Sequence, residues 1–162
     1  MTNQNAKNPD PVNALQAAIE RESSAFAQLV DLLRDEQRVL LAARPEGLEE
    51  IVAKKNRTLE ALAGLGQDRI ETMVALGLPR DPDAAERRMA RHPLGGAYRR
   101  LRELARTSAV LNKLNGRLAT QKLQFVSARL DVLRGAAQRG GLYDATGRSG
   151  DAASAGRVIA AA

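Results

Sequence analysis

Apolar residues recur every seven positions through the second half of the chain. The repeat runs without a break, and its members are Leu104, Leu111, Leu118, Phe125 and Val132. The positions two residues after each member are polar, so one seam of a helix would face a partner and the other side would face water. Because no proline follows Pro93, the pattern predicts one helix over residues 94–139, about 65 Å long at about 1.5 Å per residue. Its apolar stripe ends near residue 135, where the composition becomes rich in glycine.

Polar and small residues interrupt the middle of this predicted helix. Ser108, Asn112 and Asn115 are spaced three or four apart and therefore share one side, and Gly116 follows them. One interpretation is tolerated surface polarity together with a close packing point at the glycine. The other is that a polar residue in the seam fixes the register of the packed helices.

The apolar stripe of this helix widens after residue 118, where Leu123 joins the repeat and its neighbours. A stripe wider than one packing seam is either buried more deeply or left for a partner. We take six residues as the candidate surface for a bound partner: Leu118, Phe125, Val126, Leu130, Val132 and Leu133.

Two further helices are predicted ahead of the long one. Apolar residues at helical spacing mark a helix over residues 11–43, interrupted by Glu22 and Glu36. A second helix over 45–77 opens at Pro45, a favourable first position. The connection between the two is so short that they must be antiparallel neighbours.

A short polar helix over 83–91 connects this hairpin to the long helix. The fold class expected is all-α: an elongated antiparallel bundle of three long helices with a short connector helix and a flexible C-terminal tail. The expected organisation is a disordered lead over 1–10, a helical bundle domain over 11–139 and a flexible Gly/Ala-rich tail over 140–162.

One aromatic residue stands in the predicted tail. Leu142 and Tyr143 lie between glycine-rich stretches. The pair is either a site of weak local packing or a short docking motif, since an aromatic anchor in a flexible segment can reach a pocket on another protein.

The composition offers little material for catalysis. The chain of 162 residues has no cysteine and a single histidine, His92, which removes the commonest nucleophile–base pairs and metal sites. We therefore expect no enzyme, no cofactor and no metal. Aromatic residues are 2% of the chain, which fits a bundle packed by leucine and alanine.

Positive charge is concentrated in the second half of the chain. Residues 1–79 contain 9 Lys/Arg and 12 Asp/Glu, whereas residues 80–162 contain 16 and 7. Such asymmetry can serve an acidic or nucleic-acid partner, or arginine can simply be the residue that solvates this surface. The arginines lack aromatic neighbours that could stack on bases, so we expect no nucleic-acid binding. No apolar stretch is long enough to span a membrane, and the N-terminus lacks the apolar core of a signal peptide.

Four stretches resemble the FlgN family of flagellar export chaperones. They are LLRDEQRVLLA in the first predicted helix, the leucines around Lys54 and Lys55 in the second, LNKLNGRLA in the third, and LYDATGR after it. The resemblance covers about residues 12–148. Its most characteristic part combines an internal helix motif with the tail pair, namely Asn112, Asn115 and Gly116 with Leu142 and Tyr143.

The resemblance implies a cytoplasmic chaperone without enzymatic activity. Members of the family bind C-terminal segments of hook–filament junction proteins, keep them soluble and deliver them to the flagellar type III export gate. By this resemblance the widened helix stripe would bind the client, and the segment containing Tyr143 would dock on the gate.

Two other classes of function stay open. A basic helical protein could bind nucleic acid through its positive half, with an affinity that falls steeply as salt rises. A structural coiled coil would instead self-associate through the seam over 104–132, and its mass in solution would rise with concentration.

Overall fold

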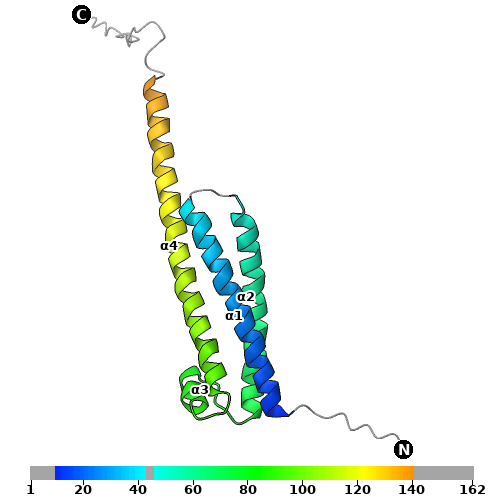
Figure 1. Ribbon diagram of the computed structural model, residues 1–162. Helices are drawn as coiled ribbons and strands as arrows, with labels where there is room; N and C mark the ends of the chain where they lie inside the picture. The colour runs from blue at the N-terminus through cyan, green and yellow to red at the C-terminus, as the bar shows by residue number, and fades with distance from the viewer. Residues whose placement is uncertain (1–9, 43–45, 141–162) are drawn as a thin grey trace, which may run out of the picture. The chain divides into compact units, whose positions relative to one another are not determined.

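The computed structural model of the protein describes residues 10–42 and 46–140, with side chains up to residue 136. The regular secondary structure of this described part is helical: α1 Pro11–Ala42, α2 Leu48–Ala75, α3 Pro82–Met89 and α4 Gly95–Gly140 (Figure 1). The predicted all-α class is confirmed. The chain divides into two compact units, which we call unit 1 (Met1–Ala119) and unit 2 (Thr120–Ala162), and α4 contributes residues to both.

Glycines set the two ends of α2. The helix begins at Leu48 rather than at Pro45, because Gly47 has a φ of 82°, a left-handed conformation that glycine adopts without strain. At the other end, Gly77 has a φ of 72°, and the N–H groups of Gly77 and Leu78 donate to carbonyls in the last turn. This is the usual way in which a glycine ends a helix.

The remaining boundaries differ from the prediction by a few residues. The short helix α3 starts at Pro82 and ends at Met89. Helix α4 continues through Gly135 to Gly140, although its apolar stripe was expected to end near residue 135. A glycine inside a helix costs only about 1 kcal/mol relative to alanine, which the surrounding turns can offset.

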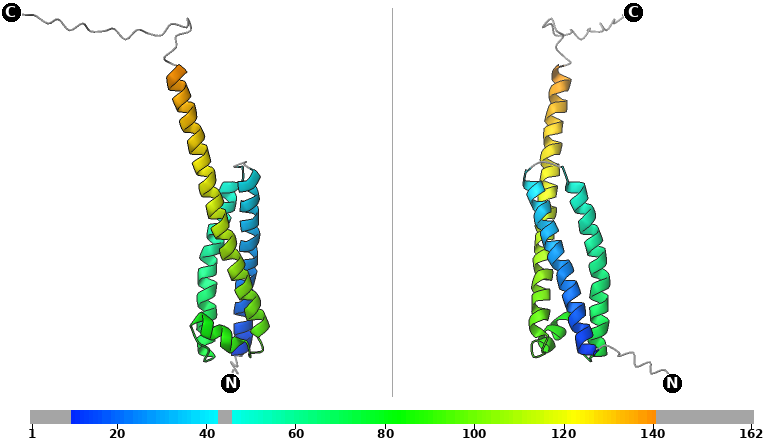
Figure 2. Two further views of the ribbon diagram at one scale, coloured as in Figure 1. Left: turned by 90° about the vertical axis from the view of Figure 1, so that its left-hand side faces the viewer. Right: turned by 45° about the vertical axis from the view of Figure 1, so that its right-hand side comes forward.

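Helices α1 and α2 form the predicted antiparallel hairpin (Figure 2). Glu22 of α1 pairs with Arg69 of α2, and Glu36 pairs with Lys55, each at 2.5 Å. Residue numbers therefore fall along α2 as they rise along α1. The two glutamates that interrupt the apolar stripe in the sequence are buried, and their ion pairs are part of the interior.

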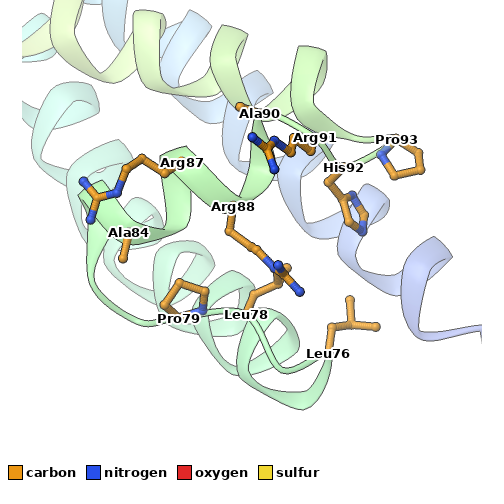
Figure 3. A pocket seen from close by; sticks show the side chains of 10 residues that line it. All are labelled: Leu76, Leu78, Pro79, Ala84, Arg87, Arg88, Ala90, Arg91, His92 and Pro93. Carbon is orange, nitrogen blue, oxygen red and sulfur yellow. The ribbon is translucent and has the colours of Figure 1, made fainter.

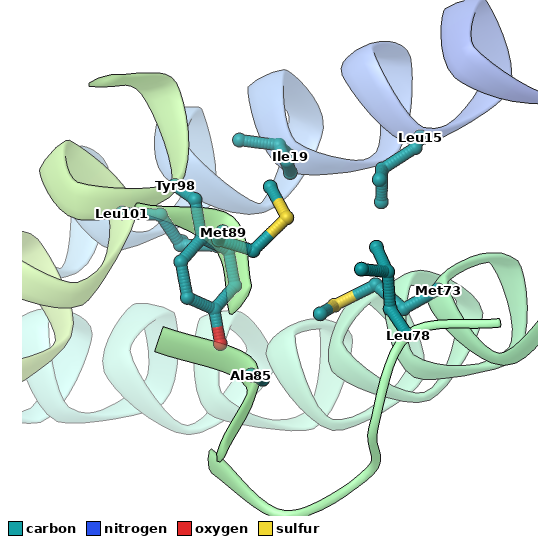
Figure 4. Close-up of a cluster of buried hydrophobic side chains, with 8 residues drawn as sticks. All are labelled: Leu15, Ile19, Met73, Leu78, Ala85, Met89, Tyr98 and Leu101. Atoms are coloured by element: carbon teal, nitrogen blue, oxygen red, sulfur yellow. The ribbon is translucent and has the colours of Figure 1, made fainter. Parts of the chain in front are cut away.

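The core of unit 1 alternates apolar clusters with these ion pairs. The larger cluster joins α1, α2, α3 and the start of α4 (Figure 4), and its members are Leu15, Ile19, Met73, Leu78, Ala85, Met89, Tyr98 and Leu101. A second cluster is formed by Leu29, Leu33 and Leu62. The guanidinium of Arg69 lies 5.7 Å from the ring centroid of Tyr98, so an aromatic face covers the ion pair next to the larger cluster.

The most deeply buried residues of α4 in unit 1 are not the members of the seven-residue apolar repeat. Leu101, Ser108 and Asn115 are buried, whereas Leu104 and Leu111 are half-buried beside them. A packed helix uses two positions in each heptad. Here the second position is occupied by Ser108 and Asn115, so a search for apolar residues does not find it.

Candidate functional site

Unit 2 exposes a broad apolar face on α4. The exposed fraction of its large apolar side chains runs from 46% at Leu130 to 72% at Leu123, and the six are Leu123, Phe125, Val126, Leu130, Val132 and Leu133. We call these six residues the apolar face of unit 2. So many exposed apolar side chains on one stretch of helix indicate an interaction site, because burying apolar surface releases about 25 cal/mol for each Å².

The apolar face consists of two stripes along the helix. Leu123, Val126, Leu130 and Leu133 are three or four residues apart and form the first, and Phe125 and Val132, seven apart, form the second. Between the stripes, the guanidinium of Arg129 lies 5.4 Å from the centroid of the Phe125 ring. The second stripe is thus bordered by a cation.

The structure distributes the predicted surface between the two units. Leu118 is half-buried in unit 1, and the other five predicted residues are exposed in unit 2. Leu123, which the predicted set omitted, is more exposed than any of them. The signal for it was present in the sequence, since it belongs to the same widened stripe.

Asn115 lies inside unit 1 and connects α4 to α1. It is 2% exposed, and its Nδ2 group donates to the Leu33 carbonyl at 2.7 Å and to Glu36 Oε2 at 2.8 Å. Its Oδ1 atom has no hydrogen-bond partner among the described residues. Asn115 is therefore not a polar residue tolerated at the surface, whereas the exposed Asn112 is one. The contacts favour a register-fixing role, because a shift of α4 would leave the amide without either acceptor.

Gly116 is not the close packing point that the sequence suggested. A Cβ atom built on it would meet nothing within 4 Å outside its own helix, whereas one on Gly66 would lie 3.3 Å from Glu22 Oε1.

We expect Gly116→Ala to raise the free energy of unfolding by about 1 kcal/mol, because alanine is the better helix former. Urea denaturation measures this. Gly66→Ala is the control, with a smaller gain or a loss; equal gains for both would contradict the difference in space.

The remaining candidates are a possible metal cluster, His92 and the predicted docking pair. Across residues 10–42 and 46–136, no group of three His, Cys, Asp or Glu side chains could hold a metal ion. The Nδ1 atom of His92 accepts a hydrogen bond from the Leu94 N–H at 3.2 Å, ahead of α4, so this ring helps the chain to enter the helix. The predicted docking pair, Leu142 and Tyr143, lies outside the described residues.

Comparison with known protein families finds a match over most of the sequence. Residues 11–150 match the family described as FlgN protein, which is most of the chain. The chain belongs to the FlgN family. No curated protein and no solved structure matches it. The match includes the hairpin, the connector and all of α4, so the apolar face of unit 2 lies within the region that defines family membership.

Membership in the FlgN family assigns a general role to the chain. The family comprises flagellar export chaperones, which bind proteins destined for type III export, and it is not known for enzymatic activity. Within the described part of this FlgN-family chain, no helix combines the length and the apolar character needed to cross a membrane.

Proposed function

We propose that this FlgN-family chain is a cytoplasmic chaperone for hook–filament junction proteins. It binds their C-terminal segments through the apolar face of unit 2, keeps them soluble and delivers them to the export gate. The proposal combines the family role with one observation, the exposure of six large apolar side chains on a single helix.

The form of this surface suggests how the client binds. An exposed apolar face on a helix suits an amphipathic segment that lays its own apolar residues alongside, at spacings of three, four and seven. Affinity then comes from apolar burial rather than from ion pairs. A chaperone must also release its client, so a modest interface suits delivery better than an obligate one.

The direct test is a calorimetric titration of the full chain with the C-terminal segment of a junction protein. Apolar burial predicts a negative change in heat capacity and little dependence on salt. The matched comparison is a titration with a single-stranded RNA oligonucleotide. Binding of RNA alone, with an affinity that falls steeply as salt rises, would favour the nucleic-acid alternative. A mass that rises with protein concentration while no client binds would favour the structural coiled coil.

Tyr143 is the residue that we propose for docking on the export gate. It stands with Leu142 in a glycine-rich segment, and a tyrosine can bury a large ring and still place its hydroxyl in a hydrogen bond. Tyr143→Ala should reduce association with the gate and export of the client, while client affinity and thermal stability stay unchanged. Ile159→Ala, which removes another apolar side chain of the tail, is the matched control. A variant that loses client binding instead would reverse the assignment.

A further inference from the structure

A basic hollow lies in unit 1 where the loop after α2, the helix α3 and the loop before α4 meet (Figure 3). Its volume is about 950 Å³, and it is open to solvent. Three arginines line it, namely Arg87, Arg88 and Arg91. The apolar part of its wall comes mainly from the two loops, through Leu76, Leu78, Pro79 and Pro93, with Ala84 and Ala90 beside them. We call this feature the arginine hollow.

The three arginines of the hollow have no carboxylate partner in the described part of the chain. Helix α3 carries two acids, Asp83 and Glu86. Glu86 is directed to α4, where it pairs with Arg102 at 3.4 Å and with Arg106 at 3.0 Å. Glu86 is therefore engaged away from the hollow, and Asp83 forms no ion pair with any of the three arginines in the described part of the chain. Each guanidinium group is a rigid fork of donors that matches a carboxylate.

Helix α3 is short, but a cap and buried side chains fix its position in unit 1. The Asp81 side chain accepts a hydrogen bond from the Ala84 N–H at 2.7 Å and caps the helix, and Ala85 and Met89 are buried in the larger core cluster. Behind it, a Cβ atom on Gly95 would lie 2.3 Å from the Met89 carbonyl oxygen, so a glycine is required for this close approach. The backbone that carries the arginines is thus ordered before any ligand arrives, which lowers the entropic cost of binding.

One more polar group borders the hollow. The His92 ring, which lines it, uses Nδ1 to accept the Leu94 N–H. In a neutral imidazole the proton is then on Nε2, which is left as a donor. The hollow therefore presents donors and positive charge, beside apolar side chains.

We propose that the arginine hollow is a docking site for an acidic peptide segment of a partner protein. Several carboxylates of the segment pair with Arg87, Arg88 and Arg91, and an apolar residue between them contacts the wall formed by Leu76, Leu78 and the prolines. The same cations could attract the phosphates of RNA. However, no Phe, Tyr or Trp is among the described residues that line the hollow, so bases have no ring to stack on. An apolar wall next to unpaired guanidinium groups suits a peptide better.

The test uses the full chain and a fluorescent peptide in which glutamates alternate with leucines, at physiological ionic strength. The variant Arg87→Gln/Arg88→Gln/Arg91→Gln removes the cations of the hollow. The matched control Arg99→Gln/Arg100→Gln/Arg117→Gln removes the same charge from exposed positions of α4 that lie outside the hollow and have no ion pair in the described part. Circular dichroism confirms that both variants keep their helices.

The expected result is binding of the peptide that weakens at least about tenfold in the first variant and less than about twofold in the second. A peptide with glutamine in place of glutamate should bind neither variant nor the unaltered chain. Equal losses in the two variants would overturn the proposal, since net charge alone would then account for binding. No binding of the peptide, or tighter binding of a single-stranded RNA at the same site, would overturn it as well.

Discussion

Replacing Phe125 and Leu133 with alanine together is expected to weaken binding of the client segment at least about tenfold, which corresponds to about 1.4 kcal/mol. One side chain comes from each stripe of the apolar face, and they are 62% and 64% exposed in the free protein. Because neither fills a core, truncating them removes apolar area that only a client would cover. The helical signal and the free energy of unfolding should change little. Calorimetry with the client segment and urea denaturation of the same sample measure both quantities.

The control for this double variant is truncation of two equally exposed apolar residues in unit 1. Leu41 and Val110 are 63% and 67% exposed, so Leu41→Ala/Val110→Ala removes equally exposed apolar side chains, although fewer carbon atoms, outside the apolar face. Client binding should survive in this control. Normal client binding by the Phe125/Leu133 variant would place the client elsewhere, and its unfolding would mean that the two residues stabilise the protein itself.

Replacing Glu36 with methionine is expected to lower the free energy of unfolding by about 3 kcal/mol. Glu36 accepts from the Lys55 ammonium at 2.5 Å and from Asn115 Nδ2 at 2.8 Å, and the Lys55 side chain is only 14% exposed. Methionine has the length of glutamate but no charge, so the ammonium would stay in a mostly buried place without a partner. Urea denaturation followed by circular dichroism measures the loss.

Removing the partners as well should restore most of this stability. The triple variant Glu36→Met/Lys55→Met/Asn115→Leu removes all three polar side chains of this network, so none of them is left buried without a partner. Apolar replacement of a buried ion pair is often neutral or stabilising. The exposed pair Asp31–Arg34, with side chains 74% and 61% exposed, is the control. Asp31→Ala should cost less than about 1 kcal/mol, because such pairs are screened by water. A loss no larger for Glu36→Met than for Asp31→Ala would show that the buried network contributes little.

Local periodicity in the sequence determined which residues form helices and which elements are neighbours. The spacing of apolar residues predicted the three long helices, and the connection ahead of α2 was too short for anything but a hairpin. Both depend on contacts between residues a few positions apart, which the order of residues alone specifies. The widened stripe after residue 118 was visible for the same reason, and with it most of the apolar face of unit 2.

The tertiary structure decided the features that depend on distances between remote residues. A wide stripe can be buried or exposed, and only the exposed fractions of Phe125 and its neighbours distinguished the two. The pairing of Glu36 with Lys55 and Asn115 joins three helices, so no local pattern could show that an apparent interruption of the stripe is an interior ion pair.

The same reason explains the errors at glycines and in the α4 seam. Gly116 and Gly95 look alike in the sequence, yet a side chain would be accommodated at the first and would collide with the Met89 carbonyl at the second. An apolar repeat predicts a buried position only where the residue is apolar. The buried positions of Ser108 and Asn115 in α4 were therefore missed. The arginine hollow likewise exists only because the fold brings the loop after α2, helix α3 and the loop before α4 together, while Glu86 is drawn away to α4.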